Sequence, residues 1–249
     1  YTALENEQLK PLKDAFEKAN PGIEVVWVRD STGVITARLL AEKGNPKADV
    51  IWGVSVSSVA LFDQQGMLEP YTPKGADMLK PHFVDSKKPM MWTGIDAYAS
   101  VIVYNSKEGA AKKVAQPKEW ADLTKPEYKG MIVMPNPASS GTGYLMVSAW
   151  LQTMGEKAGW EFMDKLHQNV SNYTHSGSAP CVQAARGERV IGLCLDMRAA
   201  SEKTKGAPIE ISVPKNNGWE IEASGIHKGT KNLDAAKKLI DWSVSKQAA

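Results

Sequence analysis

Residues 131–143 read MIVMPNPASSGTG, a short apolar run followed by a loop of small and hydroxyl-bearing residues. A helical pattern over 144–154 comes next, so the stretch predicts a strand, a loop and a helix. The first backbone N–H groups of a helix have no partner within the helix and carry the positive end of its dipole. The loop therefore predicts an anion-binding site. Its donors are Ser139, Ser140, Gly141 and Thr142.

The same loop has a simpler interpretation, in which Ser139 or Ser140 only caps the following helix. The loop contains no Lys, which excludes the phosphate-binding loop of nucleotide-binding proteins. Further loops of the same kind elsewhere in the chain shift the balance toward an anion site.

Composition and charge exclude several classes of protein. Apolar residues make up 43% of the 249 residues and charged residues 23%, so the chain can bury a core as one large domain or two smaller ones. A net charge of +2 spread along the chain gives no basic patch and no case for nucleic acid. Apolar runs such as 99–104 are too short to span a bilayer. No signal peptide is recognised, and a helix-like opening at Tyr1 is typical of a processed or trimmed chain.

Helix and strand patterns alternate through the first part of the chain. Strands are expected over 23–28 and 48–52, separated by a helix through Leu40, and a helix before Asn20 is expected to begin or kink at Pro11. Such alternation predicts a mostly parallel sheet with ligands at the carboxyl ends of its strands. Small polar residues follow both strands, which places them at one edge of the sheet. They are Ser31, Thr32 and Gly33 in the first loop and Ser55, Ser57 and Ser58 in a second loop over 53–58.

The second half repeats this organisation. Residues 173–178 read YTHSGS and precede a short helix over 181–186, and a strand over 190–196 ends in Asp196-Met-Arg198. Two α/β lobes with polar strand ends predict a small-molecule cleft between them. Extended crossings over 92–105 and 209–226 provide a two-segment hinge. The expected division is 1–97 with 223–249 for the first lobe and 98–222 for the second.

The two cysteines, Cys181 and Cys194, leave two possibilities open. A short helix running back against its following strand places them side by side, which permits a disulfide, and two buried free thiols are equally expected. An oxidising compartment favours the bridge. No Cys or His lies at the spacing of a zinc site, so no metal or cofactor is expected.

The motifs DSTG (30–33), PNPASSGTG (135–143) and THSGS (174–178) together carry a family resemblance that extends over almost the whole chain. The chain resembles the periplasmic solute-binding proteins of ABC transporters, in the two-lobe type II group that includes ferric-ion binders. Within this group it is most similar to proteins assigned to 2-aminoethylphosphonate binding. The further segments that match are YTALE (1–5), 15–43, ADVIWG (48–53), GMLEPY (66–71), 124–145 and GAPIEI (206–211).

The resemblance implies a periplasmic, monomeric protein with no enzymatic activity. It implies capture of a small amine-bearing anion, 2-aminoethylphosphonate or a relative such as γ-aminobutyrate, and delivery to an ABC transporter membrane permease. The chain departs from the pattern in three places. It ends soon after a helix over 233–245, where further helices of the first lobe are expected, and the stretches GVSVSS (53–58) and LCLDMR (193–198) differ in a way that implies altered ligand preference, by divergence or by engineering.

Candidate ligand contacts follow from the chemistry of such an anion. Its anionic head is expected on the loop that contains Ser140, with the DSTG loop opposite and Ser176 and Ser178 as a third set of donors. Its ammonium is expected on Asp196 first and Asp96 second, with cation–π contacts from Trp52, Trp92 and Tyr98.

Each of these candidates has an alternative. Asp196 pairs with Arg198 or a lysine, the tryptophans pack in the core, or Arg198 itself binds the anion with two parallel donors. A ferric-ion or phosphate-ester binding protein, an engineered sensor derivative and a serine hydrolase are the other functions considered. No adjacent tyrosine pair and no Gly-x-Ser-x-Gly elbow supports the iron or hydrolase alternatives.

Overall fold

The computed structural model describes residues 1–248 and divides into two compact units. Unit 1 contains Tyr1–Ala97 and the chain from Ile221 onward, and unit 2 contains Tyr98–Glu220. The two boundaries lie inside the long strands β3 (Thr93–Asn105) and β8 (Trp219–His227). The chain therefore passes from one unit to the other inside two regular strands, β3 and β8.

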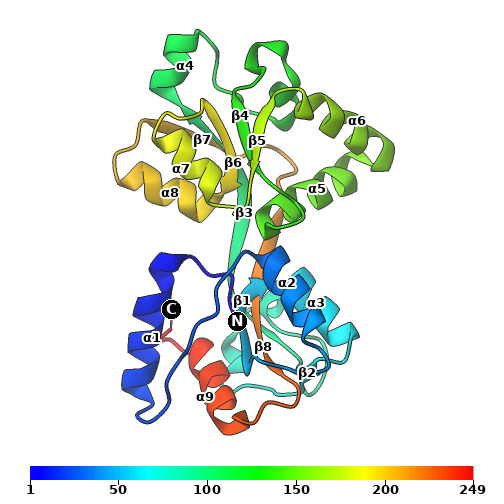
Figure 1. The fold of residues 1–249 in the computed structure, drawn as a ribbon, viewed down its shortest axis with the longest axis vertical. Coiled ribbons are helices and arrows are strands. Elements are labelled where there is room, and N and C mark those ends of the chain that lie inside the picture. The colour runs from blue at the N-terminus through cyan, green and yellow to red at the C-terminus, as the bar shows by residue number, and fades with distance from the viewer. Residues whose placement is uncertain (249) are drawn as a thin grey trace. The chain divides into compact units, whose positions relative to one another are not determined.

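Unit 2 is a mixed sheet with helices on both faces. Strand β4 (Ile132–Pro135) is parallel to β5 (Val170–Thr174) and β6 (Ile191–Leu195), whereas β3 is antiparallel to β6 and to β7 (Ile209–Ser212). Figure 1 shows α5 (Gly141–Met154) and α6 (Glu156–His167) on one side of this sheet. Helices α7 (Ala179–Ala185) and α8 (Asp196–Thr204) cover the other side, and α4 (Ser106–Lys112) follows β3.

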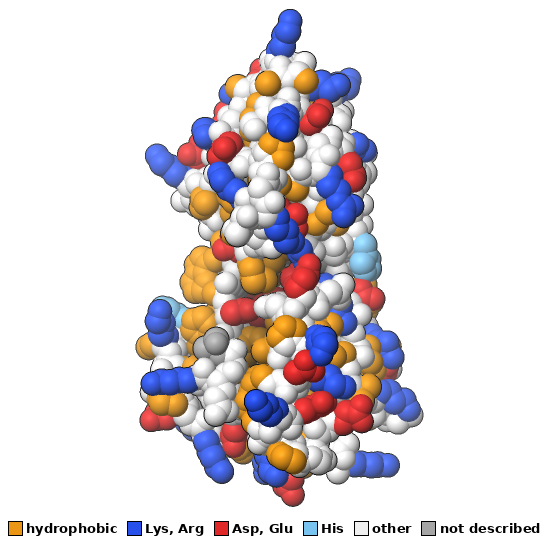
Figure 2. Space-filling view, turned by 90° about the vertical axis from the view of Figure 1, so that its left-hand side faces the viewer, with side chains coloured by type: hydrophobic (Ala, Val, Ile, Leu, Met, Phe, Trp, Pro, Cys, Tyr) orange, Lys and Arg blue, Asp and Glu red, His pale blue; other side chains and the backbone are white. Residues whose placement is uncertain are grey.

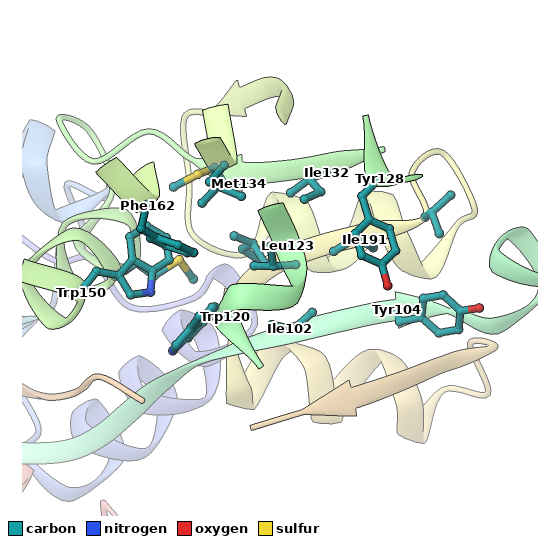
Figure 3. Packing of buried hydrophobic residues seen from close by; sticks show 14 residues of the cluster. Ile102, Tyr104, Trp120, Leu123, Tyr128, Ile132, Met134, Trp150, Phe162 and Ile191 are labelled. Carbon is teal, nitrogen blue, oxygen red and sulfur yellow. The ribbon is translucent and has the colours of Figure 1, made fainter. Parts of the chain in front are cut away.

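Aromatic and branched side chains fill the core between this sheet and helices α5 and α6. Trp150 contacts Trp120 and Phe162 edge to face, with ring centroids 5.4 and 5.1 Å apart (Figure 3). Every residue of β4 and β6 is buried, because helices cover both faces of the sheet. This packing holds α5 and α6 against the sheet.

Unit 1 is built around β8, which pairs antiparallel with β1 (Val50–Ser55) and β2 (Leu68–Glu69). Its helices are α1 (Asn6–Ala19), α2 (Thr32–Ala41), α3 (Val56–Gln64) and α9 (Leu233–Ser243). Phe16 of α1, Trp52 of β1 and Trp242 of α9 meet in one buried cluster. A second buried cluster joins α2 and α3 to β1, so these two helices are fixed relative to each other.

Several expectations about local structure are wrong. The sheets are not mostly parallel, because the long strands β3 and β8 run against their neighbours. Residues 53–58 are not a loop: β1 continues to Ser55 and α3 begins at Val56, which places Ser57 and Ser58 in the helix. The second crossing is two strands, β7 and β8, separated by a turn in which Asn216 has a φ of 55°.

Helix starts also differ from the sequence expectations. Helix α1 begins before Pro11 and includes it, and α5 begins at Gly141, three residues before the expected start of the helical pattern. Asp196 begins α8 rather than ending a strand. Residues 23–28 are extended but form no strand, and the nearest ladder contact is the parallel bridge between Thr2 and Arg29.

Cys181 and Cys194 form a disulfide between α7 and β6, with Cα atoms 5.6 Å apart and both side chains buried. The bridge closes a short loop, for which chain-entropy arguments give a stabilisation of about 3 kcal/mol. We expect Cys181→Ala with Cys194→Ala to lower the melting temperature by roughly 6–12 °C. Thermal unfolding followed by circular dichroism checks this, and an unchanged melting temperature would show that the bridge does not stabilise the fold.

Candidate functional site

The N-terminus of α5 combines a capped helix start with free donors. The Oγ of Ser140 accepts a hydrogen bond from the Gly143 N–H at 3.3 Å, so the capping interpretation is confirmed for Ser140. Capping leaves the amides of Gly141 and Thr142 without a hydrogen-bond acceptor anywhere in residues 1–248. Both residues are buried, and the helix dipole adds positive potential at this point. The cap and the anion site are therefore compatible features of one helix end.

A second loop, residues 174–178, lies directly against this helix end. Ser139 donates its hydroxyl to the His175 carbonyl at 2.8 Å, which ties the two loops together. Gly177 packs so closely that a Cβ there would clash with the Thr142 hydroxyl and lie 3.1 Å from Ser140 Oγ. Glycine is therefore required at position 177 for this approach.

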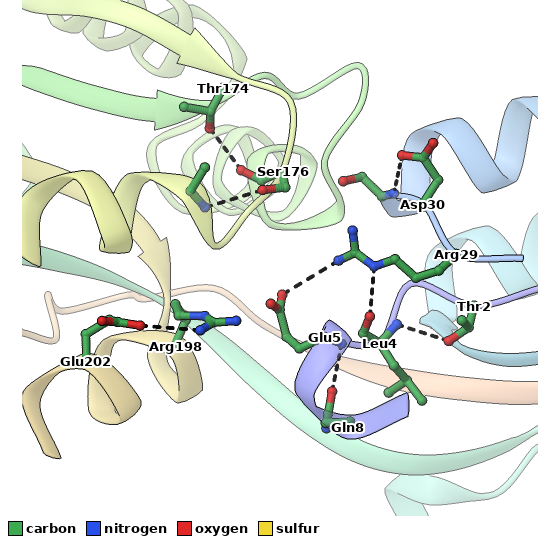
Figure 4. A network of polar contacts seen from close by, with 12 residues as sticks. Thr2, Leu4, Glu5, Gln8, Arg29, Asp30, Thr174, Ser176, Arg198 and Glu202 are labelled. Atoms are coloured by element: carbon green, nitrogen blue, oxygen red, sulfur yellow. Dashed lines mark hydrogen bonds and ion pairs between the residues drawn. The ribbon is translucent and has the colours of Figure 1, made fainter. Parts of the chain in front are cut away.

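Within the 174–178 loop, the hydroxyl groups have different tasks. Ser176 accepts a hydrogen bond from the Ala179 N–H at 3.3 Å, and its carbonyl accepts the Thr174 hydroxyl at 2.9 Å (Figure 4). Ser178 is buried at the start of α7, and in the described chain its side chain makes no capping hydrogen bond. The hydroxyls of Thr142 and Ser178 make no hydrogen bond within residues 1–248, so both are available to a ligand in unit 2.

Asp196 has a structural task in addition to any contact with a ligand. Its Oδ1 accepts hydrogen bonds from the Met197 N–H at 2.8 Å and from the Ala99 N–H at 3.1 Å. The carboxylate therefore holds the start of α8 against β3. Arg198, in the first turn of α8 and buried, pairs with Glu202 at 3.3 Å (Figure 4). The guanidinium lies in the unit that carries the α5 loop, consistent with the alternative in which it binds an anion.

The expected aromatic wall does not form as a set. Trp52 is 3% exposed, stacks on Trp27 with ring centroids 5.0 Å apart and contacts Trp242, so it is a core residue of unit 1. Trp92 packs against a different cluster of the same unit. Tyr98 is buried in unit 2 and donates its hydroxyl to Glu220 at 3.2 Å. Core packing was the alternative given for the tryptophans, and Trp52 is such a core residue. Asp96 is half-buried in β3.

Unit 1 carries its own hydroxyl cluster at the starts of α2 and α3. Thr32 Oγ1 lies 3.5 Å from Ser55 Oγ, and the Thr36 hydroxyl donates to Ser58 Oγ at 2.9 Å. Ser31 precedes α2 at its N-cap position. The hydroxyl groups that the sequence was expected to bring together therefore do meet, although they lie at the starts of two helices and the end of β1 rather than in two loops. Thr36 was missed by sequence analysis, although its spacing of four residues from Thr32 on a helix is a usable signal.

Arg29 and Glu5 were also missed. Arg29 donates through Nε to the Leu4 carbonyl at 3.0 Å, and its guanidinium lies 4.0 Å from Glu5 Oε1 (Figure 4). The residue directly precedes the DSTG motif at the end of an extended segment. An arginine at that point offers the forked donors that suit a phosphoryl or carboxylate group, so the sequence position was the available signal.

Two further properties concern the described chain as a whole. Among residues 1–248, no His, Cys, Asp or Glu side chains gather in a group of three or more suited to a metal ion. None of the helices in that range has the length and apolar character needed to cross a membrane. Figure 2 shows charged side chains of both signs interspersed over the viewed face, which agrees with the absence of a basic stripe in the sequence.

Residues 45–249 match the family of bacterial extracellular solute-binding proteins. The chain belongs to this family. A protein of Haemophilus influenzae with no assigned function is 35% identical over 229 residues, which cover 90% of this chain and 66% of that protein. The chain thus spans just under two thirds of this relative. Membership also confirms the expected periplasmic location.

Solved structures confirm the fold class, α/β of the two-lobe type II kind. The periplasmic binding protein AfuA of Actinobacillus pleuropneumoniae, with fructose 6-phosphate bound, is 32% identical with a TM-score of 0.95, covering 99% of this chain and 78% of AfuA. A Salmonella typhimurium protein whose name assigns it to 2-aminoethylphosphonate binding is 28% identical, covering 94% of this chain and 68% of that protein. Both names describe ligands with a phosphoryl group.

Proposed function

We propose that this member of the solute-binding family captures a small organic anion bearing a phosphoryl group and delivers it, as a monomer, to an ABC transporter permease. The observation that carries the proposal is the N-terminus of α5, where the Gly141 and Thr142 amides and the Thr142 hydroxyl are all available. A phosphoryl group has three oxygens that accept hydrogen bonds, and a helix N-terminus stabilises its charge without reorganisation.

The hydrogen-bond donors in unit 2 are numerous enough for micromolar binding of an anion. The two amides with the hydroxyls of Thr142 and Ser178 make four donors in unit 2 alone. At roughly 1.5–3 kcal/mol for each hydrogen bond to a charged group, the sum reaches the roughly 8 kcal/mol of a micromolar complex. Arg198 adds a cation, and the hydroxyls of Ser140 and Ser176, which accept backbone hydrogen bonds through Oγ, each keep a hydrogen to donate. Ser139 instead donates its hydroxyl to the His175 carbonyl and so ties the two loops together.

A sugar phosphate is the first candidate for the whole ligand. Sugar hydroxyls are bound by side chains that both donate and accept, and unit 1 offers such a set at the starts of α2 and α3. We include Ser31, Thr32, Gly33, Ser57 and Ser58 among the proposed ligand-binding residues, with Arg29 added. The likeness to AfuA supports this candidate.

The second candidate is 2-aminoethylphosphonate or a related amine-bearing anion. Asp196 favours it, because within residues 1–248 this carboxylate accepts its two hydrogen bonds through Oδ1, which leaves Oδ2 for an ammonium group. The likeness to the Salmonella protein supports it as well.

Titration calorimetry tests the function and separates the candidates. The panel is fructose 6-phosphate, 2-aminoethylphosphonate, γ-aminobutyrate, inorganic phosphate and ferric citrate. We expect binding of at least one of the first two compounds and recovery of the compound unchanged afterwards. Absence of heat with every phosphoryl compound would refute the proposal, and chemical conversion would indicate an enzyme instead.

Asp196→Asn provides a matched test of the ammonium contact, because the amide oxygen of Asn can still accept the Met197 and Ala99 N–H groups. If the ligand carries an ammonium group, its affinity falls about 10-fold in the variant, through loss of a charge-assisted hydrogen bond. Affinity for a sugar phosphate should change less than about 3-fold. Equal loss for both ligands would show that Asp196 acts only by holding α8 in place.

A further inference from the structure

The first loop of the α5 site, residues 135–143, uses several of its hydrogen-bond acceptors on its own backbone. The Asn136 carbonyl accepts the Ser139 and Ser140 N–H groups at 3.2 and 2.9 Å. The Asn136 side-chain oxygen accepts the Ala138 N–H at 2.9 Å. The Ser140 carbonyl accepts the Tyr144 N–H at 2.9 Å. These oxygen atoms are therefore already bonded within the protein.

The second loop, residues 174–178, shows the same pattern. The Thr174 carbonyl accepts the Asn136 N–H at 2.8 Å, which joins this loop to the first one. The His175 carbonyl accepts the Ser139 hydroxyl at 2.8 Å. The Ser176 carbonyl accepts the Thr174 hydroxyl at 2.9 Å (Figure 4). These carbonyl oxygens are thus used between the loops rather than kept for a hydrogen of the ligand.

Hydrogen-bond donors are what the two loops leave for a ligand. The amides of Gly141 and Thr142 have no acceptor in residues 1–248. In the same range the Thr142 and Ser178 hydroxyls make no hydrogen bond, although the two residues are only 6% and 8% exposed. The close approach of Gly177, where a Cβ would lie 2.3 Å from Thr142 Oγ1, brings the two loops together. Neither loop contains Asp or Glu, so together they offer donors and no carboxylate.

We propose that this site takes sulfo groups as well as phosphoryl groups, so that the ligand class is an organic phosphate or phosphonate together with its sulfate or sulfonate analogue. The inference rests on the proposed function and extends it to a second acidic group. Both groups are tetrahedral and present three terminal oxygens that accept hydrogen bonds when ionised. The amides of Gly141 and Thr142 and the hydroxyls of Thr142 and Ser178 donate to either group.

Rejection of a sulfo group requires a protein atom that only accepts hydrogen bonds. A carboxylate accepts the hydrogen of a singly protonated phosphoryl group and repels a sulfo oxygen, which carries no hydrogen. A hydroxyl group does not discriminate in this way, because it rotates to donate or to accept. The carboxylate that the proposed function places near the ligand is Asp196, which accepts the Met197 and Ala99 N–H groups through Oδ1. Sulfo binding requires that its Oδ2 meets the rest of the ligand and not the acidic group.

Charge determines the expected difference in affinity between the two groups. At pH 7.5 a phosphoryl group, whose second pKa is about 6, carries nearly two negative charges, and a sulfo group carries one. The start of α5 and Arg198 favour the larger charge, so the sulfo compound should bind more weakly, by at most about 30-fold. At pH 5 only about a tenth of the phosphoryl compound is doubly charged, so the two affinities should converge by about 10-fold.

The ratio of the two affinities separates the proton of the ligand from the protons of the protein. In the two loops and the first turns of α5, α7 and α8, the titratable or charged side chains are His175, Tyr144, Asp196 and Arg198. A change in their protonation acts on both compounds. Between pH 7.5 and pH 5 only the phosphoryl compound takes up a proton itself, so the ratio reports this proton.

Titration calorimetry with two matched pairs tests the inference. The pairs are fructose 6-phosphate with fructose 6-sulfate, and 2-aminoethylphosphonate with its sulfonate analogue taurine. In a pair whose phosphoryl member binds, we expect the sulfo member to bind within about 30-fold at pH 7.5 and within about 3-fold at pH 5. A sulfo member that binds more than about 100-fold more weakly at both pH values would overturn the inference and leave the proposed function standing. Absence of binding by both phosphoryl compounds would refute the proposed function, and the inference with it.

Ser178→Asp should convert this set of donors into one that discriminates, with Ser178→Ala as the matched control. Ser178 is at the N-cap position of α7, where Asp is a favoured residue, so the variant should fold. At pH 5 we expect the new carboxylate to weaken binding of the sulfo compound by at least about 10-fold more than binding of the phosphoryl compound, whose hydrogen it can accept. Ser178→Ala should weaken both compounds equally, to within about 2-fold. Equal losses in Ser178→Asp would contradict the inference.

Discussion

Thr142→Asp is expected to weaken binding of the phosphoryl ligand by at least about 100-fold while the protein stays folded. The substitution removes a hydroxyl donor and places a carboxylate where the anion is proposed to lie, so attraction becomes repulsion. Asp in the first turn of a helix is favourable by about 0.3–1 kcal/mol, so the melting temperature should be unchanged or slightly higher. Loss of affinity with retained stability distinguishes a ligand site from a helix cap.

Thr153→Asp is the matched control for this variant. Thr153 is exposed on the last turns of the same helix and donates to the Ala149 carbonyl at 2.7 Å. The change in net charge is the same, but the new carboxylate is at the far end of α5. We expect calorimetry to give unchanged affinity for Thr153→Asp. If Thr142→Asp binds as tightly as Thr153→Asp, the α5 loop serves only to cap the helix.

The sequence predicted the hydroxyl-rich helix starts well, because their signals are local. A strand that ends in Ser, Gly and Thr before a helical pattern predicts the same arrangement wherever it occurs. The contacts of Thr32 with Ser55 and of Ser139 with His175 show that segments distant in sequence come together in each unit. The resemblance carried by DSTG, PNPASSGTG and THSGS gave the fold class, which no single loop could provide.

The failures come from contacts between distant segments. Trp52 was expected to make a cation–π contact with the ligand, but Trp27 and Trp242 surround it in the core. Residues 23–28 have strong β propensity, yet a strand requires partners on its edges, and among residues 1–248 the neighbouring ladder contact is the single bridge between Thr2 and Arg29. The sequence also gave no sign that Asp196 Oδ1 accepts a hydrogen bond from the Ala99 N–H, about a hundred residues away in sequence, and the ammonium contact expected for Asp196 stays a prediction.

These failures and the proposed site have a common physical basis. Donors that a helix leaves unpaired are determined by the local sequence, so an anion site at α5 is visible without the fold. Side chains that pair across the sheet are determined by topology, and antiparallel pairing of β3 with β6 was not expected. Arg29 combines both cases. Its position directly before DSTG can be read from the local sequence, whereas its hydrogen bond to the Leu4 carbonyl depends on the fold.

Trp150→Ala is expected to cause the largest loss of stability, because this side chain is 1% exposed and is packed between Trp120 and Phe162. Truncation of a buried tryptophan costs about 3–5 kcal/mol, which corresponds to a fall in melting temperature of roughly 6–20 °C. Trp160→Ala is the matched control, because Trp160 lies in the neighbouring helix α6 and is 51% exposed. Its melting temperature should fall by at most about 3 °C.

Ligand affinity in Trp150→Ala, measured well below its melting temperature, separates the core from the site. The start of α5 is held by the Ser140 cap and by the hydrogen bond from Ser139 to the His175 carbonyl. Neither contact involves Trp150, so the space left by Trp150→Ala removes neither of them. We therefore expect affinity within about 10-fold of the unchanged protein, because these local contacts keep the donors in place. A larger loss, with the variant still folded, would show that the core packing of α5 rather than the loop contacts fixes the anion site.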